Sequence, residues 1–293
     1  MHIGSRRCCF EDLIMKPLIT TAELQRALAD SRTVLIDARA GADAALRYAQ
    51  GHLRGARFVD LDRDLARRAD VVASGGRHPL PAPADFARVL ARLGIGSDSQ
   101  VVAYDDKSGA NAAARFWWMA RSAGLSQVQV LDGGLQAAIE HGLELVVEVD
   151  AHAEAEPIPF SAWRLPLADA DVVRDETERH SAPVIDVREP RRYRGEVEPF
   201  DLVTGHIPGA VNLPFIENLD ESGRFLEPAV LRAAYEKVLA GRPPESAIVH
   251  CGSGVTACHT LLGFDLAGLA MPRLYVGSWS EWSGRGLPIA TGE

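Results

Sequence analysis

One cysteine of this chain stands in a loop whose composition favours a reactive thiolate. Residues 251–257 read Cys-Gly-Ser-Gly-Val-Thr-Ala and follow a short apolar run, residues 246–250, which predicts a buried strand ending at Cys251. Apolar residues then recur at helical spacing as far as Gly268. A glycine-rich turn between a strand and a helix directs backbone N–H groups inward, and such a nest stabilises a thiolate, a persulfide or an oxyanion. The sequence therefore predicts that Cys251 is a nucleophile.

The alternative interpretation of Cys251 is a small buried hydrophobe, the usual role of a cysteine at the end of a strand. The residues that follow it favour catalysis, because a structural cysteine does not need a loop free of bulky side chains. We expect this loop to bind whatever the thiol reacts with. Its members are Gly252, Ser253, Gly254, Val255 and Thr256.

A cysteine in a loop before a helix also serves phosphatases, and one position argues against that chemistry. Phosphate-ester hydrolysis of this kind needs a guanidinium six residues after the cysteine to hold the phosphoryl oxygens. The residue at that position is Ala257. Phosphatase activity is therefore the weaker interpretation.

The other three cysteines show no pattern that suggests chemistry. Cys258 falls inside the expected helix, and Cys8 and Cys9 belong to an N-terminal stretch without periodicity. Four cysteines at these spacings make neither a disulfide framework nor a zinc site, and we expect no metal. A reducing compartment fits this usage, and we expect a cytoplasmic protein.

Length and charge limit the class of protein and its partners. The chain has 293 residues, 47% of them hydrophobic, which is enough for two domains with separate cores. Its formal net charge of -9 argues against nucleic acid or a membrane surface as partner, while allowing a local pocket for a small anion. No run approaches the length of a membrane span, and residues 1–18 lack the apolar core of a secretory signal. We expect the folded part to begin near Pro17.

The two halves of the chain carry similar segments in the same order, which indicates a diverged duplication. The matching segments are residues 34–39 and 184–188, 51–56 and 205–210, 101–105 and 247–251, and 130–134 and 274–278. Each half alternates short apolar runs with helical patterns, the clearest of them at 84–93, 112–123 and 228–240. This alternation predicts an α/β fold in which each half is a mostly parallel sheet with helices on both faces.

The duplication also predicts which half is catalytic. Asp105 occupies in the first half the position that Cys251 has in the second. We therefore predict a non-catalytic domain over residues 17–143, a linker rich in Glu, Ala and Pro over 144–165, and a catalytic domain over 166–293. A site fed by both domains would lie in the cleft between them.

Several polar residues near the predicted strand ends have competing interpretations. Arg191, Arg192 and Arg194 follow the strand that ends at Asp186 and would lie at the same sheet edge as Cys251, where one of their guanidiniums could bind a carboxylate or sulfonate. A solvated basic loop is an equally good interpretation from composition. For Asp37 and Asp186 we expect structural roles, either accepting backbone N–H bonds or pairing with an arginine. His52 and His206 occur in both halves alike, so we expect them to be structural as well.

Taken together, three segments resemble the tandem-rhodanese sulfurtransferases. They are residues 251–257, residues 205–210 (Gly-His-Ile-Pro-Gly-Ala) and residues 278–282 (Ser-Trp-Ser-Glu-Trp), and the resemblance extends over nearly the whole chain from about Pro17. Residues 116–119 and 131–135 look like the inactive N-terminal domain of the same family. The cysteine loop is that of the 3-mercaptopyruvate sulfurtransferase branch, whereas the thiosulfate branch usually has Arg and Lys in place of Gly252 and Ser253.

The resemblance implies two rhodanese-like domains and roles for individual residues. Cys251 matches the cysteine that takes up sulfur as a persulfide, and Arg192 matches an arginine that holds the anionic end of the donor. Ser253, Asp62 and His78 match a trio proposed to move protons in the mercaptopyruvate branch. A second substrate arginine of animal members falls at or beside Phe200. This departure leaves Arg192 and backbone groups as the expected partners of the donor's carboxylate.

The resemblance also implies the reaction. A small anionic donor, 3-mercaptopyruvate, transfers sulfane sulfur to Cys251, and the persulfide passes it to cyanide, a thiol or a reduced thioredoxin-like acceptor. The implied chemistry needs no cofactor, because the N–H groups of the loop stabilise the charged sulfur. The alternatives are a thiosulfate sulfurtransferase and, from a different class, a persulfide carrier module.

Overall fold

The structure is a computed structural model that describes residues 15–67 and 71–293. It contains two five-stranded sheets, and every pair of neighbouring strands in them is parallel. The first has the order β1-β6-β5-β2-β4, with β1 Leu18–Ile19, β2 Thr33–Asp37, β4 Arg57–Phe58, β5 Gln100–Tyr104 and β6 Val128–Leu131. The second has the order β10-β9-β11-β12-β8, with β8 Leu167–Ala168, β9 Val184–Asp186, β10 Val211–Asn212, β11 Ile248–His250 and β12 Arg273–Tyr275. When the second order is read in reverse, from β8 to β10, it matches the first strand for strand, as the duplication predicts.

The helices alternate with these strands along the chain. In the first half they are α1 Thr21–Ala27, α2 Ala44–Gln50, α3 Leu61–Asp64, α4 Pro83–Arg92, α5 Ala112–Ala123 and α6 Gly134–Glu140. In the second half they are α7 Ala170–Arg179, α8 Pro190–Tyr193, α9 Pro228–Leu239, α10 Ala257–Leu266 and α11 Ser278–Gly284, with 3-10 turns η1 Phe215–Asn218 and η2 Pro244–Ser246. Local signals explain several helix starts: Thr20 and Glu23 form a capping box on α1, and proline opens α4, α8 and α9.

Helices cover both faces of each sheet, which confirms the predicted fold class. In β5, Val102 packs with Leu24 of α1 and Leu135 of α6, whereas its neighbour Ala103 packs in the cluster that contains Phe86 of α4. The strands show this alternation because successive side chains point to opposite faces. In the second sheet, α7 and α11 cover one face and α9 and α10 the other.

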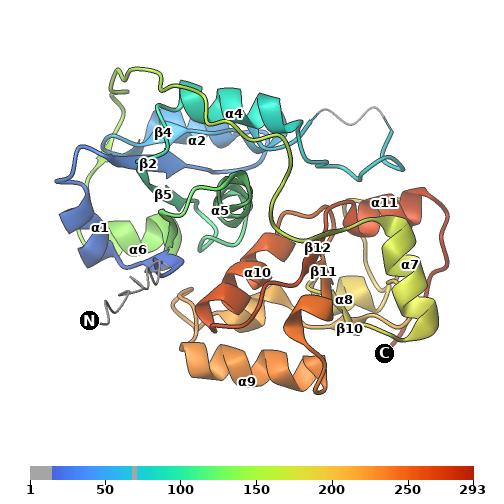
Figure 1. The fold of residues 1–293 in the computed structure, drawn as a ribbon. Coiled ribbons are helices and arrows are strands. Elements are labelled where there is room, and N and C mark those ends of the chain that lie inside the picture. Colours follow the sequence, from blue (N-terminus) through green and yellow to red (C-terminus); the bar gives the residue numbers. More distant parts are fainter. Residues whose placement is uncertain (1–14, 68–70) are drawn as a thin grey trace, which may run out of the picture.

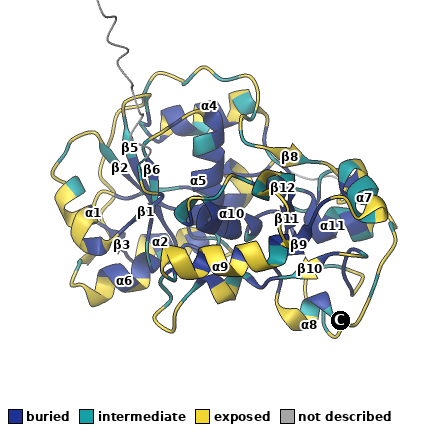
Figure 2. Cartoon of the chain, turned by 60° about the horizontal axis from the view of Figure 1, so that its bottom comes forward, coloured by how far each residue is buried: buried dark blue, intermediate teal, exposed yellow. Residues whose placement is uncertain are grey.

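The two domains share one apolar core. The cluster on the α4 and α5 face of the first sheet continues into the cluster on the α9 and α10 face of the second. Helix α5 packs directly against α10 between the sheets (Figure 1). Figure 2 shows both helices coloured mostly as buried. The shared core therefore fixes the loops of one domain against those of the other.

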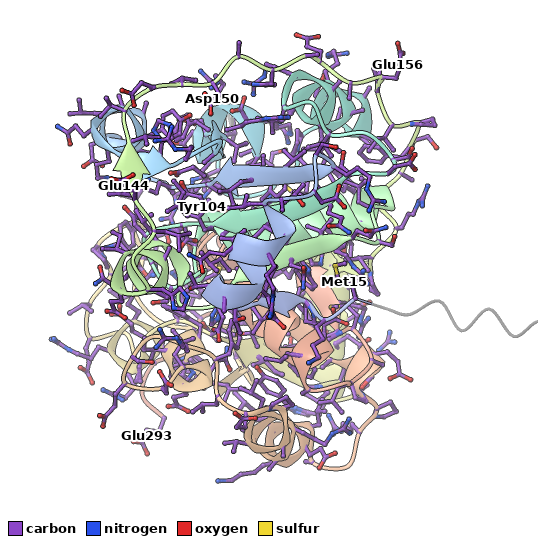
Figure 3. All side chains as sticks on the ribbon, turned by 90° about the vertical axis from the view of Figure 1, so that its left-hand side faces the viewer. Met15, Tyr104, Glu144, Asp150, Glu156 and Glu293 are labelled. Atoms are coloured by element: carbon purple, nitrogen blue, oxygen red, sulfur yellow. The ribbon has the colours of Figure 1, made fainter. Side chains whose placement is uncertain are left out.

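The segment between the domains lies against the first one. Residues 144–165, the predicted linker, include β7 Leu145–Val146, which pairs antiparallel with β3 His52–Leu53. Figure 3 labels Glu144, Asp150 and Glu156 along this segment as it crosses the outside of the first domain. Further on, Phe160 and Trp163 pack against the shared core. Within the described residues, no helix has the length and apolar character needed to cross a membrane.

Candidate active site

Cys251 lies immediately after β11, at the carboxyl edge of the second sheet, and is 1% exposed. The start of α11 holds its backbone in place. The N–H of Cys251 donates to Ser278 Oγ over 3.1 Å, and its carbonyl accepts from the N–H of Trp279 over 3.0 Å. The N–H of Ser280 donates to the carbonyl of Gly252 over 2.9 Å. These contacts fix the cysteine loop without using the N–H groups that follow Cys251.

The equivalent loop of the first domain demonstrates what this turn can bind. There, the carboxylate of Asp105 accepts from the N–H groups of Lys107, Gly109, Asn111 and Ala113 over 2.8–3.1 Å. In the second domain, none of the described residues accepts a hydrogen bond from the N–H groups of residues 252–256. The same backbone turn thus binds a built-in carboxylate in one domain, whereas in the other its donors have no acceptor among the described residues and are available to an anion.

Two glycines of the loop are required by its surroundings. Gly254 has φ +74, and a Cβ there would lie 2.4 Å from the carbonyl oxygen of Val276. At Gly252 a Cβ would lie 3.1 Å from Nη2 of Arg77 and 3.2 Å from Nη2 of Arg192. Gly252 therefore leaves room for two guanidinium groups directly beside the cysteine.

A cavity of ≈ 850 Å³ opens above Cys251 and is lined by both domains. Its second-domain wall includes Gly252, Ser253, Val255, Thr256, Arg192 and the 3-10 turn η1, and its first-domain wall includes Asp62, Arg77, His78 and the loop 107–111. The cysteine loop and its counterpart in the first domain therefore face the same space. This is the cleft between domains that the duplication predicts.

The structure brings Ser253, His78 and Asp62 together. His78 Nδ1 lies 2.7 Å from Ser253 Oγ, and His78 Nε2 lies 3.1 Å from Asp62 Oδ1. Burial lowers the pKa of His78 below its ordinary value, Asp62 opposes this effect, and the charges of Arg115 and Arg77 reinforce it. The imidazole is thus held in its neutral form between a hydroxyl and a carboxylate, an arrangement suited to proton transfer.

Arg192 is not part of a solvated basic loop. Its guanidinium is 12% exposed and donates to Glu198 over 2.7 Å, whereas Arg191 is 67% exposed and pairs with Glu196. Arg192 also lies 5.0 Å from the ring centroid of Phe200. Of the two interpretations left open by composition, the structure supports a positioned guanidinium at the cavity wall.

A second guanidinium, which was not expected from the sequence, lies beside Arg192 at this end of the cavity. Arg77, from the first domain, also lies against the Phe200 ring, 5.3 Å from its centroid, and pairs with Asp201 over 3.0 Å. Asp201 is also 3.8 Å from Arg192, so one carboxylate lies between the two cations. Burial raises the pKa of Asp201, Arg77 and Arg192 lower it, and the neighbouring Glu198 raises it further. Position 200 carries no cation, but an arginine from the other domain lies beside it.

Arg77 and Asp201 are the residues of this site that sequence reasoning missed. Arg77 directly precedes His78, which the resemblance places in the site, and this adjacency was a usable signal. Asp201 follows Phe200 in a stretch without periodicity and gave no signal of its own.

The residues expected to be structural are structural. Asp37 and Asp186 each accept from the arginine two positions on, Arg39 and Arg188, over 2.7 Å in fully buried pairs. His52 and His206 bond backbone carbonyls and stack on Tyr48 and Tyr193, with ring centroids 4.0 and 3.8 Å apart.

Cys258 also conforms to the structural interpretation, because it is fully buried in α10 and donates to the carbonyl of Gly254 over 3.4 Å. Burial raises the pKa of its thiol to about 12. Cys8 and Cys9 lie outside the described residues.

Comparison with known proteins identifies the family. The model of the rhodanese-like domain matches residues 20–141 and again residues 169–285. The chain belongs to the rhodanese-like family. The two matches correspond to the two sheets, so the family domain occurs twice in tandem.

Individual relatives carry names of two kinds. The chain is 41% identical over 284 residues to a probable 3-mercaptopyruvate sulfurtransferase of Pseudomonas aeruginosa, covering 94% of this chain and 98% of the relative. It is 36% identical over 276 residues to a putative thiosulfate sulfurtransferase of Mycobacterium tuberculosis, covering 91% and 93%. Among solved structures, the 3-mercaptopyruvate sulfurtransferase of Leishmania major has a TM-score of 0.80 at 31% identity, covering 92% of this chain and 74% of that one. These rhodanese-like relatives share a sulfur-transfer activity but differ in the donor that their names give.

Proposed function

We propose that this protein is a sulfurtransferase that takes sulfane sulfur from 3-mercaptopyruvate onto Cys251 and passes it to a thiol or cyanide. The proposal rests on the convergence, at one cavity, of the cysteine, two guanidiniums and the Ser253–His78–Asp62 relay. The names of the most similar relatives include this donor.

In the first half-reaction, the Cys251 thiolate attacks the sulfur of the donor. The new S–S bond takes the place of the donor's C–S bond, whose electron pair stays on carbon as the enolate of pyruvate. That enolate takes up the proton released from the donor's thiol, and the relay through Ser253 and His78 is placed to carry it. Pyruvate leaves, and Cys251 holds a persulfide.

In the second half-reaction, an acceptor thiolate or cyanide attacks the outer sulfur. The S–S bond to Cys251 breaks, and its electron pair returns to the cysteine as thiolate. The loop N–H groups, which have no acceptor among the described residues, stabilise the anionic sulfur in both half-reactions. Arg192 and Arg77 hold the carboxylate of the donor by charge-assisted hydrogen bonds.

The location and partners of the enzyme belong to the same proposal. Cys251 and Cys258 are both unpaired in the described part of the chain, which suits a reducing cytoplasm. A small thiol or a reduced thioredoxin-like protein would then regenerate the free cysteine. No nucleic acid or membrane surface is needed.

Side-by-side steady-state rates with 3-mercaptopyruvate and thiosulfate, with cyanide as the acceptor, test this proposal. We expect continuous turnover and a higher kcat/KM with 3-mercaptopyruvate. A higher kcat/KM with thiosulfate would assign the enzyme to the runner-up donor. A single loading of sulfur without turnover on either small donor would make the chain a persulfide carrier and overturn the enzymatic proposal.

Donor choice should respond to the charge at the far end of the cavity, and Asp201→Asn tests this. Thiosulfate is a dianion and 3-mercaptopyruvate a monoanion, so a carboxylate between two guanidiniums disfavours thiosulfate more. We expect Asp201→Asn to improve kcat/KM for thiosulfate relative to 3-mercaptopyruvate by roughly tenfold, which corresponds to about 1.4 kcal/mol of differential transition-state binding. The control is Asp98→Asn, an exposed aspartate before β5, at the opposite end of that strand from the site. A ratio unchanged in both variants would show that this charge does not select the donor.

The relay predicts that His78 stays neutral at unusually low pH. Because burial lowers the pKa of His78, the imidazole should take up a proton only below 6.5, its ordinary value. NMR titration of the ring, assigned by its absence in His78→Gln, measures the midpoint. Asp62→Asn should lower the midpoint further, because Asp62 favours the protonated form. A midpoint above 6.5, or an upward shift in the Asp62 variant, would contradict the assigned environment.

A further inference from the structure

Arg115 is a fully buried arginine that reaches from the first domain to the cysteine loop. It lies on α5 and has an exposed fraction of 0%. Its Nη1 donates to the carbonyl of Gly254 over 3.1 Å, and its Nη2 donates to the carbonyls of His78 over 3.0 Å and Leu65 over 3.3 Å. The guanidinium therefore contacts the backbone of the cysteine loop and of the segment that carries His78, and it is not part of the cavity lining.

The charge of Arg115 is not balanced by a carboxylate. Within residues 15–67 and 71–293, no carboxylate forms an ion pair with Arg115; the ionisable side chains that act on it are Cys258, which is also a side-chain hydrogen-bond partner, and Cys251, and its Nε has no hydrogen-bond partner. Burying an ionised group costs several kcal/mol unless an opposite charge and hydrogen bonds compensate it. Three carbonyls supply the hydrogen bonds, so what this guanidinium lacks is an anion.

Of the two thiols, Cys258 is unsuited to supply that anion. Burial raises its pKa to about 12, so it remains a neutral thiol that donates to the same carbonyl of Gly254. Cys251 is the remaining group, and it stands in a turn whose N–H donors also favour negative charge.

We propose that Arg115 is the buried counter-ion of the sulfur anion on Cys251, both as thiolate and as persulfide. This inference rests on the nucleophile of the proposed function and adds a positioning residue to it. The first domain has an aspartate where the second has its cysteine, yet it supplies the buried cation that contacts the cysteine loop. The carbonyl contacts of Arg115 also tie the cysteine loop to the segment that carries His78.

Other charged and titratable groups face Cys251, and they differ from Arg115. Arg192 and Arg77 lie beside Gly252 but are matched by Glu198 and Asp201. His78 acts through Ser253 and is held neutral. On the strand side, burial lowers the pKa of His250, which favours its neutral form. Lys107, on the first-domain wall of the cavity, is exposed to solvent. Arg115 is therefore the one fully buried cation at the cysteine loop, in the described part of the chain, without a carboxylate of its own.

The test compares Arg115→Lys, which keeps the charge, with Arg115→Gln, which keeps hydrogen bonding without charge. The rate of Cys251 alkylation by iodoacetamide is measured against pH in the full chain carrying Cys258→Ser, with the labelled peptide identified by mass spectrometry. We expect Arg115→Gln to move the midpoint of reactivity upward by about one pH unit or more, and to slow alkylation about tenfold below the midpoint. Arg115→Lys should keep the midpoint and the alkylation rate of Cys251 close to those of the parent protein. The matched control is Arg121→Gln, a partly exposed arginine of the same helix.

Equal profiles for the lysine, glutamine and parent proteins would overturn the inference and leave Arg115 as a structural tie. If the glutamine variant does not fold, the comparison of Cys251→Asp with Cys251→Asn decides. A carboxylate beside an unmatched guanidinium should raise the Tm relative to the neutral amide, and an equal or lower Tm would overturn the inference. If the Arg115 tests fail but Cys251→Ser abolishes turnover, the counter-ion inference is overturned and the proposed function stands. If Cys251→Ser retains turnover, neither the inference nor the proposed function has a basis.

Discussion

Replacing Cys251 with serine is expected to lower turnover at least about a thousandfold with either donor, because it removes the atom that carries the sulfur. A hydroxyl in the same nest ionises far less readily than a thiol and forms no persulfide. The fold should be unaffected, since the backbone bonds of residue 251 to Ser278 and Trp279 do not involve the sulfur. Steady-state rates and thermal unfolding of the purified variant check both points.

The matched control is Cys258→Ser, which changes the other buried thiol of the described chain. It should retain most of the turnover, because Cys258 is held as a neutral thiol and faces the carbonyl of Gly254. Mass spectrometry of donor-treated enzyme should find one added sulfur on the peptide that contains Cys251. Added sulfur on Cys258, Cys8 or Cys9 in its place would move the nucleophile elsewhere.

Much of the fold could be predicted because local patterns and the duplication point to the same answer. The helix expected at 112–123 is α5 Ala112–Ala123, and those expected at 84–93 and 228–240 are α4 and α9 with small differences at their ends. The two parallel sheets with the same strand order follow from alternating strands and helices that occur twice. The cysteine loop was recognisable because its glycines serve a local requirement, a tight turn without side chains beside the thiol.

The parts of the site that could not be predicted depend on contacts between domains. Arg77 and Asp201 lie 124 positions apart in the chain, and Arg115 contacts Gly254 across 139 positions. No periodicity or spacing encodes such a pair, because each residue satisfies its local rules equally well with or without the partner. Arg115 illustrates the difficulty. Alanines and aromatic residues surround it in the helix sequence, which predicts that the arginine is buried but not which groups its guanidinium contacts.

The interdomain contacts also explain why the first domain is retained although it has no cysteine in its loop. Asp105 fills the anion-binding turn of that domain with its own carboxylate. The domain then contributes to the site through other elements: His78 and Arg77 at the cavity wall and Arg115 on α5. In the proposed mechanism each of these residues acts on the chemistry of the other domain's loop, so the site would be complete only when the two domains are packed together.

The two guanidiniums beside Gly252 give the second large expected effect. Arg192→Met should lower kcat/KM for both donors by roughly tenfold to a hundredfold, since a charge-assisted hydrogen bond contributes about 1.5–3 kcal/mol. Most of the change should be in KM. Glu198, which loses one partner in this variant, keeps its bond to Arg188 over 3.2 Å, so stability should change little. Arg191→Met, at the exposed neighbouring position, serves as the control and should leave both constants unaltered.

Arg77→Met extends this prediction to the second guanidinium. Arg77 lies beside Phe200, at or beside which animal members have a second substrate arginine. We expect a loss of about tenfold in kcat/KM for 3-mercaptopyruvate, because the donor's carboxylate would keep one guanidinium of the two. The effects of Arg77→Met and Arg192→Met should not be additive, since both side chains lie against Asp201 and would share one carboxylate. A double-mutant cycle on KM measures this coupling. If Arg77→Met lowers the Tm but leaves KM for both donors unchanged, the arginine is an interdomain ion pair with Asp201 and has no part in binding the donor.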